Sequence, residues 1–202
     1  MKVIDDYIKY KDVPKNLYDR LDILLKKLDL STKKNILMDK INSIMNMKWN
    51  RVSYTIYLLP KATPRPRMGK SGIFYVKGAS DNKKIFRDWF LENNFDMIKT
   101  PCKFYCTSYF PIPSSMNITD KVLAELGFIR PVSKPDWDNV AKTYCDMCQD
   151  YLLYDDSLII EGISRKYYSI KPRIEITIEY MDDFDSEFNR KKICKRIGDN
   201  HD

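Results

Sequence analysis

The chain has 202 residues, of which 44% are hydrophobic and 31% are charged, and its formal net charge is +7. This length fits one domain with a small appendage, and the hydrophobic fraction is sufficient for a packed core, so the composition argues against a disordered chain. No apolar run is long enough to cross a bilayer, and the N-terminus lacks the apolar segment of a secretory signal. A basic chain favours a polyanionic partner such as nucleic acid, although many soluble proteins are mildly basic.

Residues 1–50 have the pattern of two successive amphipathic helices, which would form an N-terminal helical extension. Apolar residues recur at helical spacing in both segments. The first segment has Leu17, Leu21, Leu24, Leu25 and Leu28, and the second has Ile36, Leu37, Ile41, Ile44 and Met45. Ser31 or Thr32 is placed to cap the second helix. The expected helical hairpin packs either on its own domain, which is the commoner arrangement, or on a partner.

Residues 51–181 mix strand and helix patterns and are expected to form the main domain. Strands are predicted at 51–59, 73–76, 103–110, 158–168 and 173–181, the last two as a pair. Helices are predicted at 80–93, from Thr119 or Asp120 to Gly127, and in an acidic segment that begins near residue 136. Residues 182–202 form a charged tail that we expect to fray. Because strict β–α–β alternation is missing, the expected fold class is α+β (mixed α/β), a small mixed β-sheet with helices packed on it.

Acidic residues gather in Lys134-Pro-Asp-Trp-Asp-Asn-Val-Ala-Lys142 and again at Asp155-Asp156. Pro135 restrains the residue before it to an extended conformation, which places Asp136 in a turn just before the helix. Asp138 follows on the helix itself. Two acids that are two residues apart converge only when the first of them lies outside the helix, so the proline is what allows both to face one site.

Two interpretations of these acids remain open on the residues alone. An aspartate at a helix start is a good cap and suits the helix dipole, and Asp138, Lys142 and Asp146, spaced four apart, would form ordinary salt bridges. The pair Asp155-Asp156 is not explained in this way, because adjacent carboxylates between apolar segments repel each other unless a cation is near. In a strand only one of the pair would face the site, and a solvated turn is the alternative. Acids gathered in this manner favour a Mg²⁺-dependent phosphoryl-transfer site.

Basic residues accompany a loop rich in proline and glycine over residues 60–72, and we predict that they bind the phosphates of a DNA backbone. They are Arg65, Arg67, Lys70 and Lys77, with Lys166 as a further candidate. Such contacts position DNA and make binding sensitive to salt, but they do not read its sequence. A solvated basic surface is the alternative for all of them.

The five cysteines occur without a secretion signal, which predicts reduced thiols in a cytoplasm. Cys102 and Cys106 lie close together in the sequence, as do Cys145 and Cys148, so a zinc site is one interpretation. Small buried thiols are the other. We favour the second interpretation, because one pair lies in a strand pattern and the other on a helix.

The acidic motif closely resembles that of the RusA family, which are Holliday junction resolvases common in phages and prophages. The resemblance rests on Lys134-Pro-Asp-Trp-Asp-Asn-Val-Ala-Lys142, Asp146, Asp155-Asp156-Ser157-Leu-Ile159 and Lys166, and more loosely on Arg65-Pro-Arg67 and Tyr75. It covers residues 52–181, whereas residues 1–50 have no counterpart in the minimal family domain. We therefore expect an N-terminal helical extension at 1–50, a RusA-like endonuclease domain at 51–181 and a C-terminal tail at 182–202.

The resemblance implies an endodeoxyribonuclease that hydrolyses phosphodiester bonds of four-way DNA junctions in recombination or repair. It implies catalytic residues at Asp136, Asp138, Asp156 and Lys142, the three acids being the metal ligands, with supporting positions at Asn139, Asp155 and Asp146. The expected cofactor is Mg²⁺, with Mn²⁺ as a substitute and no nucleotide cofactor. The expected partners are branched DNA and a second copy of the chain in a homodimer, in the cytoplasm of a bacterial host cell and without a membrane.

Two other functions stay open. One is a broader nuclease that acts on forks and flaps during phage DNA processing. The other is a non-catalytic DNA-binding protein, which would be expected to carry a damaged set of acids, whereas here the set is complete.

Overall fold

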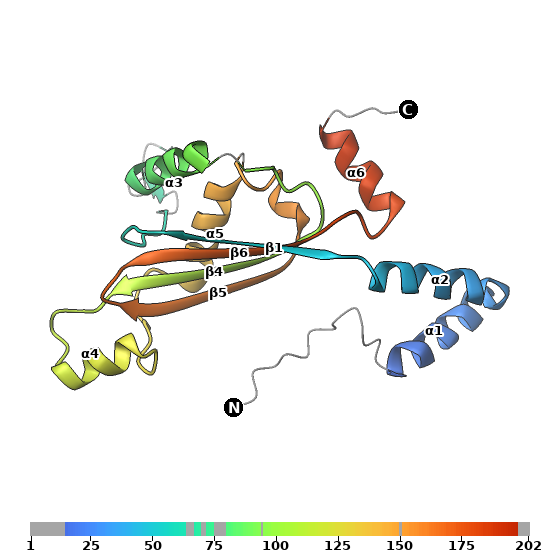
Figure 1. Ribbon diagram of the computed structural model, residues 1–202, viewed down its shortest axis with the longest axis horizontal. Helices are drawn as coiled ribbons and strands as arrows, with labels where there is room; N and C mark the ends of the chain where they lie inside the picture. Colours follow the sequence, from blue (N-terminus) through green and yellow to red (C-terminus); the bar gives the residue numbers. More distant parts are fainter. Residues whose placement is uncertain are drawn as a thin grey trace.

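The computed structural model describes residues 15–63, 67–69, 72–74, 80–93, 95–149 and 151–197. Two helices near the N-terminus lead into a four-stranded sheet, and further helices lie over one face of the sheet and beyond its ends (Figure 1). This is an α+β arrangement with a mixed sheet and an N-terminal helical region, so the predicted fold class is confirmed. None of the described helices is long and apolar enough to cross a membrane.

The main sheet consists of β1 (Trp49–Ile56), β4 (Cys102–Pro111), β5 (Ile159–Ser169) and β6 (Arg173–Met181). Their order is β1-β6-β4-β5, in which β4 runs parallel to β5 and the other neighbours are antiparallel. The predicted pairing of the last two strands is wrong, because β4 lies between them and pairs with both. A separate small hairpin joins β2 (Arg67–Gly69) to β3 (Gly72–Phe74).

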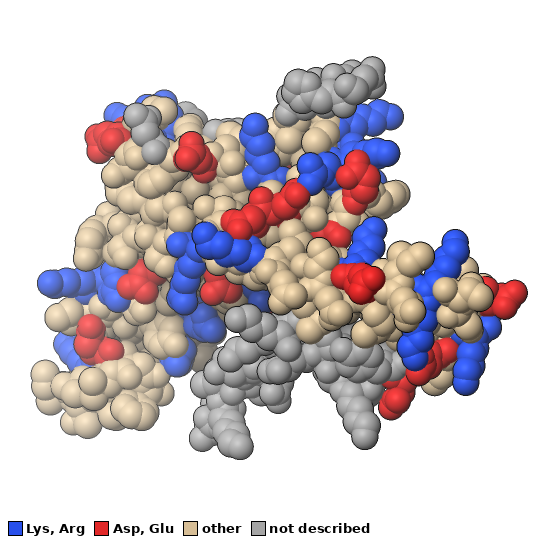
Figure 2. All heavy atoms as spheres, turned by 45° about the vertical axis from the view of Figure 1, so that its right-hand side comes forward, with Lys and Arg blue, Asp and Glu red and all other residues tan. Residues whose placement is uncertain are grey.

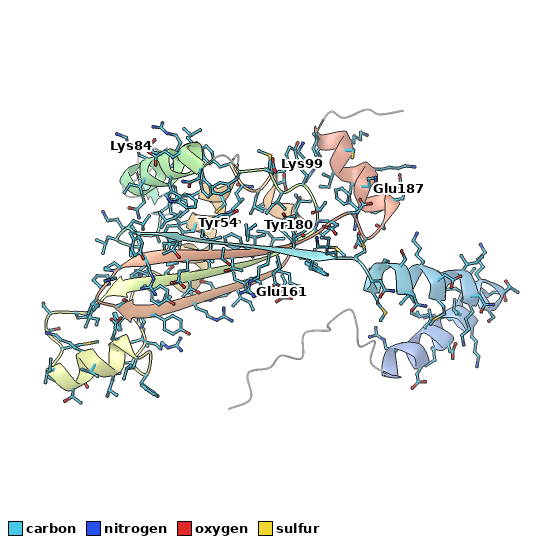
Figure 3. All side chains as sticks on the ribbon, in the orientation of Figure 1. Tyr54, Lys84, Lys99, Glu161, Tyr180 and Glu187 are labelled. Atoms are coloured by element: carbon cyan, nitrogen blue, oxygen red, sulfur yellow. The ribbon has the colours of Figure 1, made fainter. Side chains whose placement is uncertain are left out.

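Buried and partly buried residues alternate along β4, and the buried ones lie on the face of the sheet that packs against the core. Its even-numbered residues from 102 to 110 are buried, whereas the odd-numbered residues between them are only partly covered. Figure 1 shows α3 (Ser80–Asn93) and α5 (Trp137–Cys148) over one face of the sheet. Figure 3 places Tyr54 and Tyr180 on this covered side and Glu161 on the opposite side. The sheet and α5 together therefore fix the position of the acidic motif.

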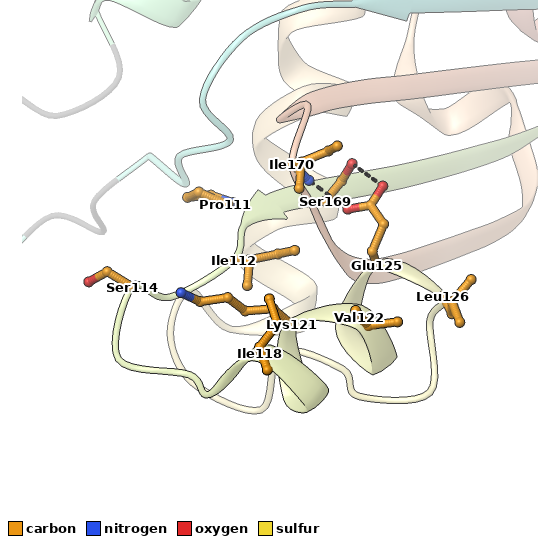
Figure 4. Close-up of a pocket in the computed structure, with 10 residues that line it drawn as sticks. All are labelled: Pro111, Ile112, Ser114, Ile118, Lys121, Val122, Glu125, Leu126, Ser169 and Ile170. Carbon is orange, nitrogen blue, oxygen red and sulfur yellow. Dashed lines mark hydrogen bonds between the residues drawn. The ribbon is translucent and has the colours of Figure 1, made fainter.

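The helix α4 (Ile118–Glu125) lies at one end of the sheet (Figure 1). Asn117 is its cap, because its Oδ1 accepts a hydrogen bond from the backbone N–H three residues on, at 2.8 Å. The helix therefore begins before the predicted Thr119 or Asp120. At its other end the Glu125 carboxylate accepts hydrogen bonds from the Ser169 hydroxyl at 3.1 Å and the Ile170 N–H at 2.6 Å (Figure 4). These bonds hold α4 to the turn between β5 and β6.

The N-terminal hairpin consists of α1 (Lys15–Lys27), a short 3₁₀ helix (Ser31–Lys33) and α2 (Lys34–Met45). The two predicted helices are present, and Lys34 forms an ion pair of 2.7 Å with Asp22 between them. The predicted capping by Ser31 or Thr32 is wrong, because both belong to the 3₁₀ helix and the cap position of α2 falls on Lys33, which makes no capping bond with its side chain. In Figure 1 the hairpin extends past the start of β1, away from the sheet.

The C-terminal segment that was expected to fray contains a helix, α6 (Glu187–Ile197). Ile193 is buried and belongs to the core, and the partly buried Phe184 and Ile197 pack against the core. A few apolar residues at helical spacing are enough to dock this segment, although most of its residues are charged or polar. The helix is thus part of the folded body.

Tyr144 shows how the core holds α5 in place. It is fully buried, its ring stacks on Phe86 with centroids 5.3 Å apart, and its hydroxyl accepts hydrogen bonds from the N–H of Lys61 at 2.9 Å and from Nδ2 of Asn82 at 3.4 Å. Burial raises the pKa of this hydroxyl, so it stays neutral. One side chain of α5 therefore fixes both the segment that follows β1 and the start of α3.

Tyr144→Phe is expected to lower the free energy of unfolding by about 1–2 kcal/mol, because the N–H of Lys61 and one N–H of Asn82 lose the hydroxyl that accepts from them. The ring and its packing remain, so the loss reports the hydroxyl alone. Denaturant titration measures the change. Tyr57→Phe is the matched control: Tyr57 is 69% exposed, and its change is expected to stay within about 0.5 kcal/mol. Equal stability of Tyr144→Phe and wild type would show that the bonds contribute nothing.

Candidate active site

The turn that leads into α5 separates the first two acids of the motif. The peptide bond between Lys134 and Pro135 is cis, and Asp136 follows as the N-cap residue in an extended conformation, with φ −64° and ψ 149°. The Asp136 carboxylate makes no capping hydrogen bond, and Asp138 lies in the first turn of the helix. Both residues are exposed. The sequence predicted this placement, and it leaves the Asp136 carboxylate uncommitted to the helix.

Two side chains hold this leading turn, residues 133–136, against β5. Nζ of Lys166 donates hydrogen bonds to the carbonyl oxygens of Ser133 and Pro135, each at 2.9 Å. Nε1 of Trp137 donates to the carbonyl oxygen of Ser164, also at 2.9 Å. Lys166 therefore supports the turn that carries Asp136. Its predicted contact with a DNA phosphate stays a prediction.

Asn139 connects α5 to the segment that leads into the basic loop. Its Nδ2 donates a hydrogen bond of 3.1 Å to the carbonyl oxygen of Thr63, and the N–H of Thr63 donates to the hydroxyl of Thr143 at 2.8 Å. Thr143 is buried. The chain is therefore fixed on α5 immediately before the stretch that carries Arg65.

The second pair of acids lies in a turn before β5 whose two members differ in environment. The Asp155 carboxylate accepts a hydrogen bond from the N–H of Ser157 at 2.8 Å, which caps a short 3₁₀ helix (Asp156–Leu158). Its hydrogen bonds with Ser157, and then the charge of Arg196, lower the pKa of Asp155. Asp156 is exposed, whereas Leu158 is buried and anchors the turn. The Asp155 carboxylate therefore stabilises the turn, whereas the Asp156 side chain is exposed to solvent.

Asp156 is electrostatically coupled to the exposed face of α5. Nζ of Lys142 lies 3.2 Å from Oδ1 of Asp146, and the hydrogen bond and charge of Asp146, followed by the charge of Asp156, raise the pKa of Lys142. The half-buried thiol of Cys145 is affected by the same two carboxylates, Asp156 and Asp146. Burial, then the charges of Asp156 and Asp146, raise its pKa to about 12. The charge of the turn before β5 therefore acts on the exposed face of α5 at Lys142, whose side chain is 69% exposed.

The donor chemistry of the predicted acids fits a hard divalent cation. Asp136, Asp138 and Asp156 offer exposed carboxylate oxygens, which are the donors that Mg²⁺ and Mn²⁺ prefer. Within the described ranges, no group of three or more His, Cys, Asp or Glu side chains is close enough together to hold a metal ion. The acids are therefore of the right kind and on adjoining elements, and their assignment as ligands stays a prediction.

The cysteines follow the interpretation as buried thiols. All five are free, and Cys102, Cys106 and Cys148 are fully buried in the core. Burial raises the pKa of Cys102 and of Cys106 to about 12, so these thiols stay protonated at neutral pH. Cys102 and Cys106 lie on β4 and Cys148 on α5, and among the described residues no group of three or more His, Cys, Asp or Glu side chains could hold a metal ion, so these residues do not support the zinc interpretation.

The basic residues predicted to grip DNA are mostly beyond what the structure describes. Arg65, Lys70 and Lys77 lie outside the described residues, and Arg67 is described only by its backbone, at the start of β2. On the face seen in Figure 2, basic and acidic side chains are interspersed, without a single basic surface that dominates the view. The predicted phosphate contacts of these four residues stay predictions.

Two residues with a part in the geometry of the site were missed by the sequence-based predictions. Trp137 holds the leading turn, and its position inside the acidic motif was the signal that could have drawn attention to it. Arg196 donates from Nη1 to Oδ1 of Asp155 at 3.4 Å and to Oγ of Ser157 at 2.9 Å. Nothing in the sequence links Arg196 to the acidic motif, because the contact depends on how α6 docks.

Comparison with known proteins gives two findings. Residues 58–179 match the family described as Endodeoxyribonuclease RusA, and this range contains all the predicted catalytic residues. The chain is also 29% identical over 135 residues to an uncharacterized protein, YqaN, of Bacillus subtilis (strain 168), a match that covers 63% of this chain and 94% of that protein. The family match spans more than half of the chain and includes β4, β5, α5 and both acid-bearing turns. The chain therefore belongs to the RusA family of endodeoxyribonucleases, which are hydrolases that act on the phosphodiester bonds of DNA.

Proposed function

We propose that this chain is a Mg²⁺-dependent, structure-selective endonuclease that resolves four-way DNA junctions during recombination or repair in the cytoplasm of a bacterial cell. RusA-family nucleases depend on a divalent metal ion and act on branched DNA, which supports the proposal. The observation that supports it most directly is that the charge of Asp156 acts on Lys142, which lies on the helix whose first turn carries Asp138. Asp136 and Asp138 come from the start of α5, and Asp156 comes from the turn before β5.

Asp136, Asp138 and Asp156 are proposed to hold the divalent ion, which when bound would neutralise phosphate charge and activate water. Lys142 lies one helical turn from Asp138 and is proposed to donate a hydrogen bond to a phosphate oxygen as negative charge develops there. Nζ of Lys142 lies 3.2 Å from Oδ1 of Asp146, which raises the pKa of Lys142 further and orients the ammonium. The hydrogen bonds of Lys166 and Trp137 hold the leading turn, and with it Asp136, in position.

The basic loop is proposed to bind DNA, and the chain is proposed to act as a homodimer. Arg65, Arg67, Lys70 and Lys77 are proposed to bind backbone phosphates, which would make binding weaken with salt. A four-way junction has approximate two-fold symmetry, so paired cuts require two active sites and favour a homodimer.

A cleavage assay on matched substrates tests the proposed function. The protein is incubated with Mg²⁺ and a synthetic four-way junction labelled on each strand in turn, beside a linear duplex, a flap and a fork built from the same arm sequences. The expected result is a pair of symmetrically placed nicks in the junction, with little cutting of the linear duplex. Mn²⁺ is expected to replace Mg²⁺.

Three outcomes would overturn parts of the proposal. Equal cutting of the linear duplex would remove selectivity for structure. Equal cutting of flaps and forks would replace junction resolution with broader processing of branched DNA. Junction binding without cutting, together with no binding of Mg²⁺ in calorimetry, would indicate a DNA-binding protein that is not an enzyme.

A further inference from the structure

The turn that presents Asp156 is held by a helix that lies beyond the family-matched range. The match ends at residue 179, and α6 spans Glu187–Ile197. From the last turn of this helix, Nη1 of Arg196 donates hydrogen bonds to Asp155 and Ser157, at 3.4 and 2.9 Å. These are the two neighbours of Asp156 in the chain. A residue outside the matched range therefore contacts both sides of a predicted metal ligand.

The position of Arg196 is set by the docking of α6 on the core. Ile193, one turn earlier on the helix, is 8% exposed and belongs to the core cluster. Ile197, next to Arg196, also packs against that cluster. The turn that Arg196 contacts is anchored by Leu158, which is 3% exposed and ends the 3₁₀ helix. Both ends of the contact are therefore fixed by buried side chains.

The side-chain hydrogen bonds of this turn are made by the neighbours of Asp156, Asp155 and Ser157. Asp155 uses its Oδ1 to accept from the Ser157 N–H and from Arg196, so this carboxylate serves the turn. The Ser157 hydroxyl also accepts from Arg196. Asp156 is exposed between them, and its charge reaches Lys142 on α5. A displacement of either neighbour would move the Asp156 carboxylate relative to α5.

We propose that Arg196 is a positioning residue: its hydrogen bonds fix the turn of residues 155–157 and so hold the Asp156 carboxylate in place relative to α5. It contacts neither the divalent ion nor DNA. This inference rests on the proposed function, in which Asp156 is a ligand of the ion. It assigns a part of the active-site geometry to the C-terminal helix.

Binding of Mn²⁺ to the full-length protein without DNA tests this role, with free Mn²⁺ measured by electron paramagnetic resonance. Arg196→Ala is expected to weaken Mn²⁺ binding about tenfold, the scale at which residues supporting metal ligands act, and Arg196→Lys less so. Arg190→Ala is the matched control, because Arg190 lies on the same helix and pairs with Asp183 and Glu187 instead. Its Mn²⁺ affinity is expected to equal that of wild type.

Junction cleavage gives a second measurement. For Arg196→Ala, the metal concentration that gives the half-maximal rate is expected to rise by the same factor, while the rate at saturating metal approaches that of wild type. Junction affinity measured in Ca²⁺ is expected to remain unchanged. Thermal unfolding of Arg196→Ala and Arg190→Ala verifies that both are folded and equally stable.

Different results would overturn different statements. Unchanged Mn²⁺ binding in folded Arg196→Ala, with Asp156→Asn reduced, removes the positioning role and leaves the ligand assignment intact. Weaker junction binding with an unchanged metal requirement shows that Arg196 contacts DNA directly. Wild-type Mn²⁺ binding by Asp156→Asn overturns the ligand assignment itself, and with it the site in the proposed function.

Discussion

Asp138→Asn is expected to reduce junction cleavage by at least about 10³-fold, because it removes one charged ligand of the divalent ion without changing the shape of the side chain. Junction binding is expected to stay within about twofold of wild type, since binding depends mainly on contacts between basic residues and phosphates. The Asp138 side chain lies in the exposed first turn of α5 and is absent from the buried core, so the fold should tolerate the amide.

Single-turnover cleavage of a labelled junction at saturating Mg²⁺ measures the first quantity, and a mobility-shift titration in Ca²⁺ measures the second. Asp88→Asn is the matched control, because Asp88 is a partly exposed acid on α3 that pairs with its neighbour Arg87. The control is expected to cut at the wild-type rate. Cleavage by Asp138→Asn at that rate would exclude Asp138 as a ligand.

Lys142→Ala is expected to reduce the rate of the chemical step by about 10²–10³-fold, the usual cost of removing one hydrogen-bond donor from a developing negative charge. The loss should persist at saturating metal, because Lys142 acts on the phosphate and is not itself a ligand. Lys142→Arg is expected to retain part of the rate. The measurement is single-turnover cleavage as a function of Mg²⁺ concentration.

Asp146→Asn separates the two roles that Lys142 could have. Asp146 is the largest cause of the raised pKa of Lys142, so its removal moves that pKa towards its ordinary value, which is still far above neutral pH. Lys142 therefore remains charged at pH 8, and Asp146→Asn is expected to cut within about tenfold of wild type. Wild-type cleavage by Lys142→Ala would instead mean that the ammonium only offsets the repulsion between the acids.

The sequence was most informative where a local rule decided the structure. The proline at 135 predicted that Asp136 would stand outside the helix and Asp138 on it, and both are found there. A strand was predicted at 103–110, and β4 occupies this range with one buried and one partly covered face. These features depend on the nearest few residues in the chain, which is why composition and spacing were enough.

The sequence was least informative where distant segments meet. Two consecutive strand patterns at 158–168 and 173–181 were expected to pair, but alternation says which face of a strand is buried and nothing about which strand lies beside it. In the charged C-terminal segment, Ile193 and Ile197 gave too short an apolar pattern to predict a docked helix. The bonds of Lys166 and Arg196 around the two turns depend on such docking and could not be predicted.

The placement of β4 between β5 and β6 has a consequence for the order in which the protein becomes functional. The sheet closes by pairing residues far apart in the chain, such as Cys102 with Tyr180 and Trp49 with Met181. Pairings of this kind form slowly, because the entropy of closing a long loop is lost before the contacts are gained. The leading turn depends on β5, and the turn around Asp156 contacts α6, both of which are synthesised after α5. We therefore expect a nascent chain to acquire the proposed cleavage site only after α6 has left the ribosome.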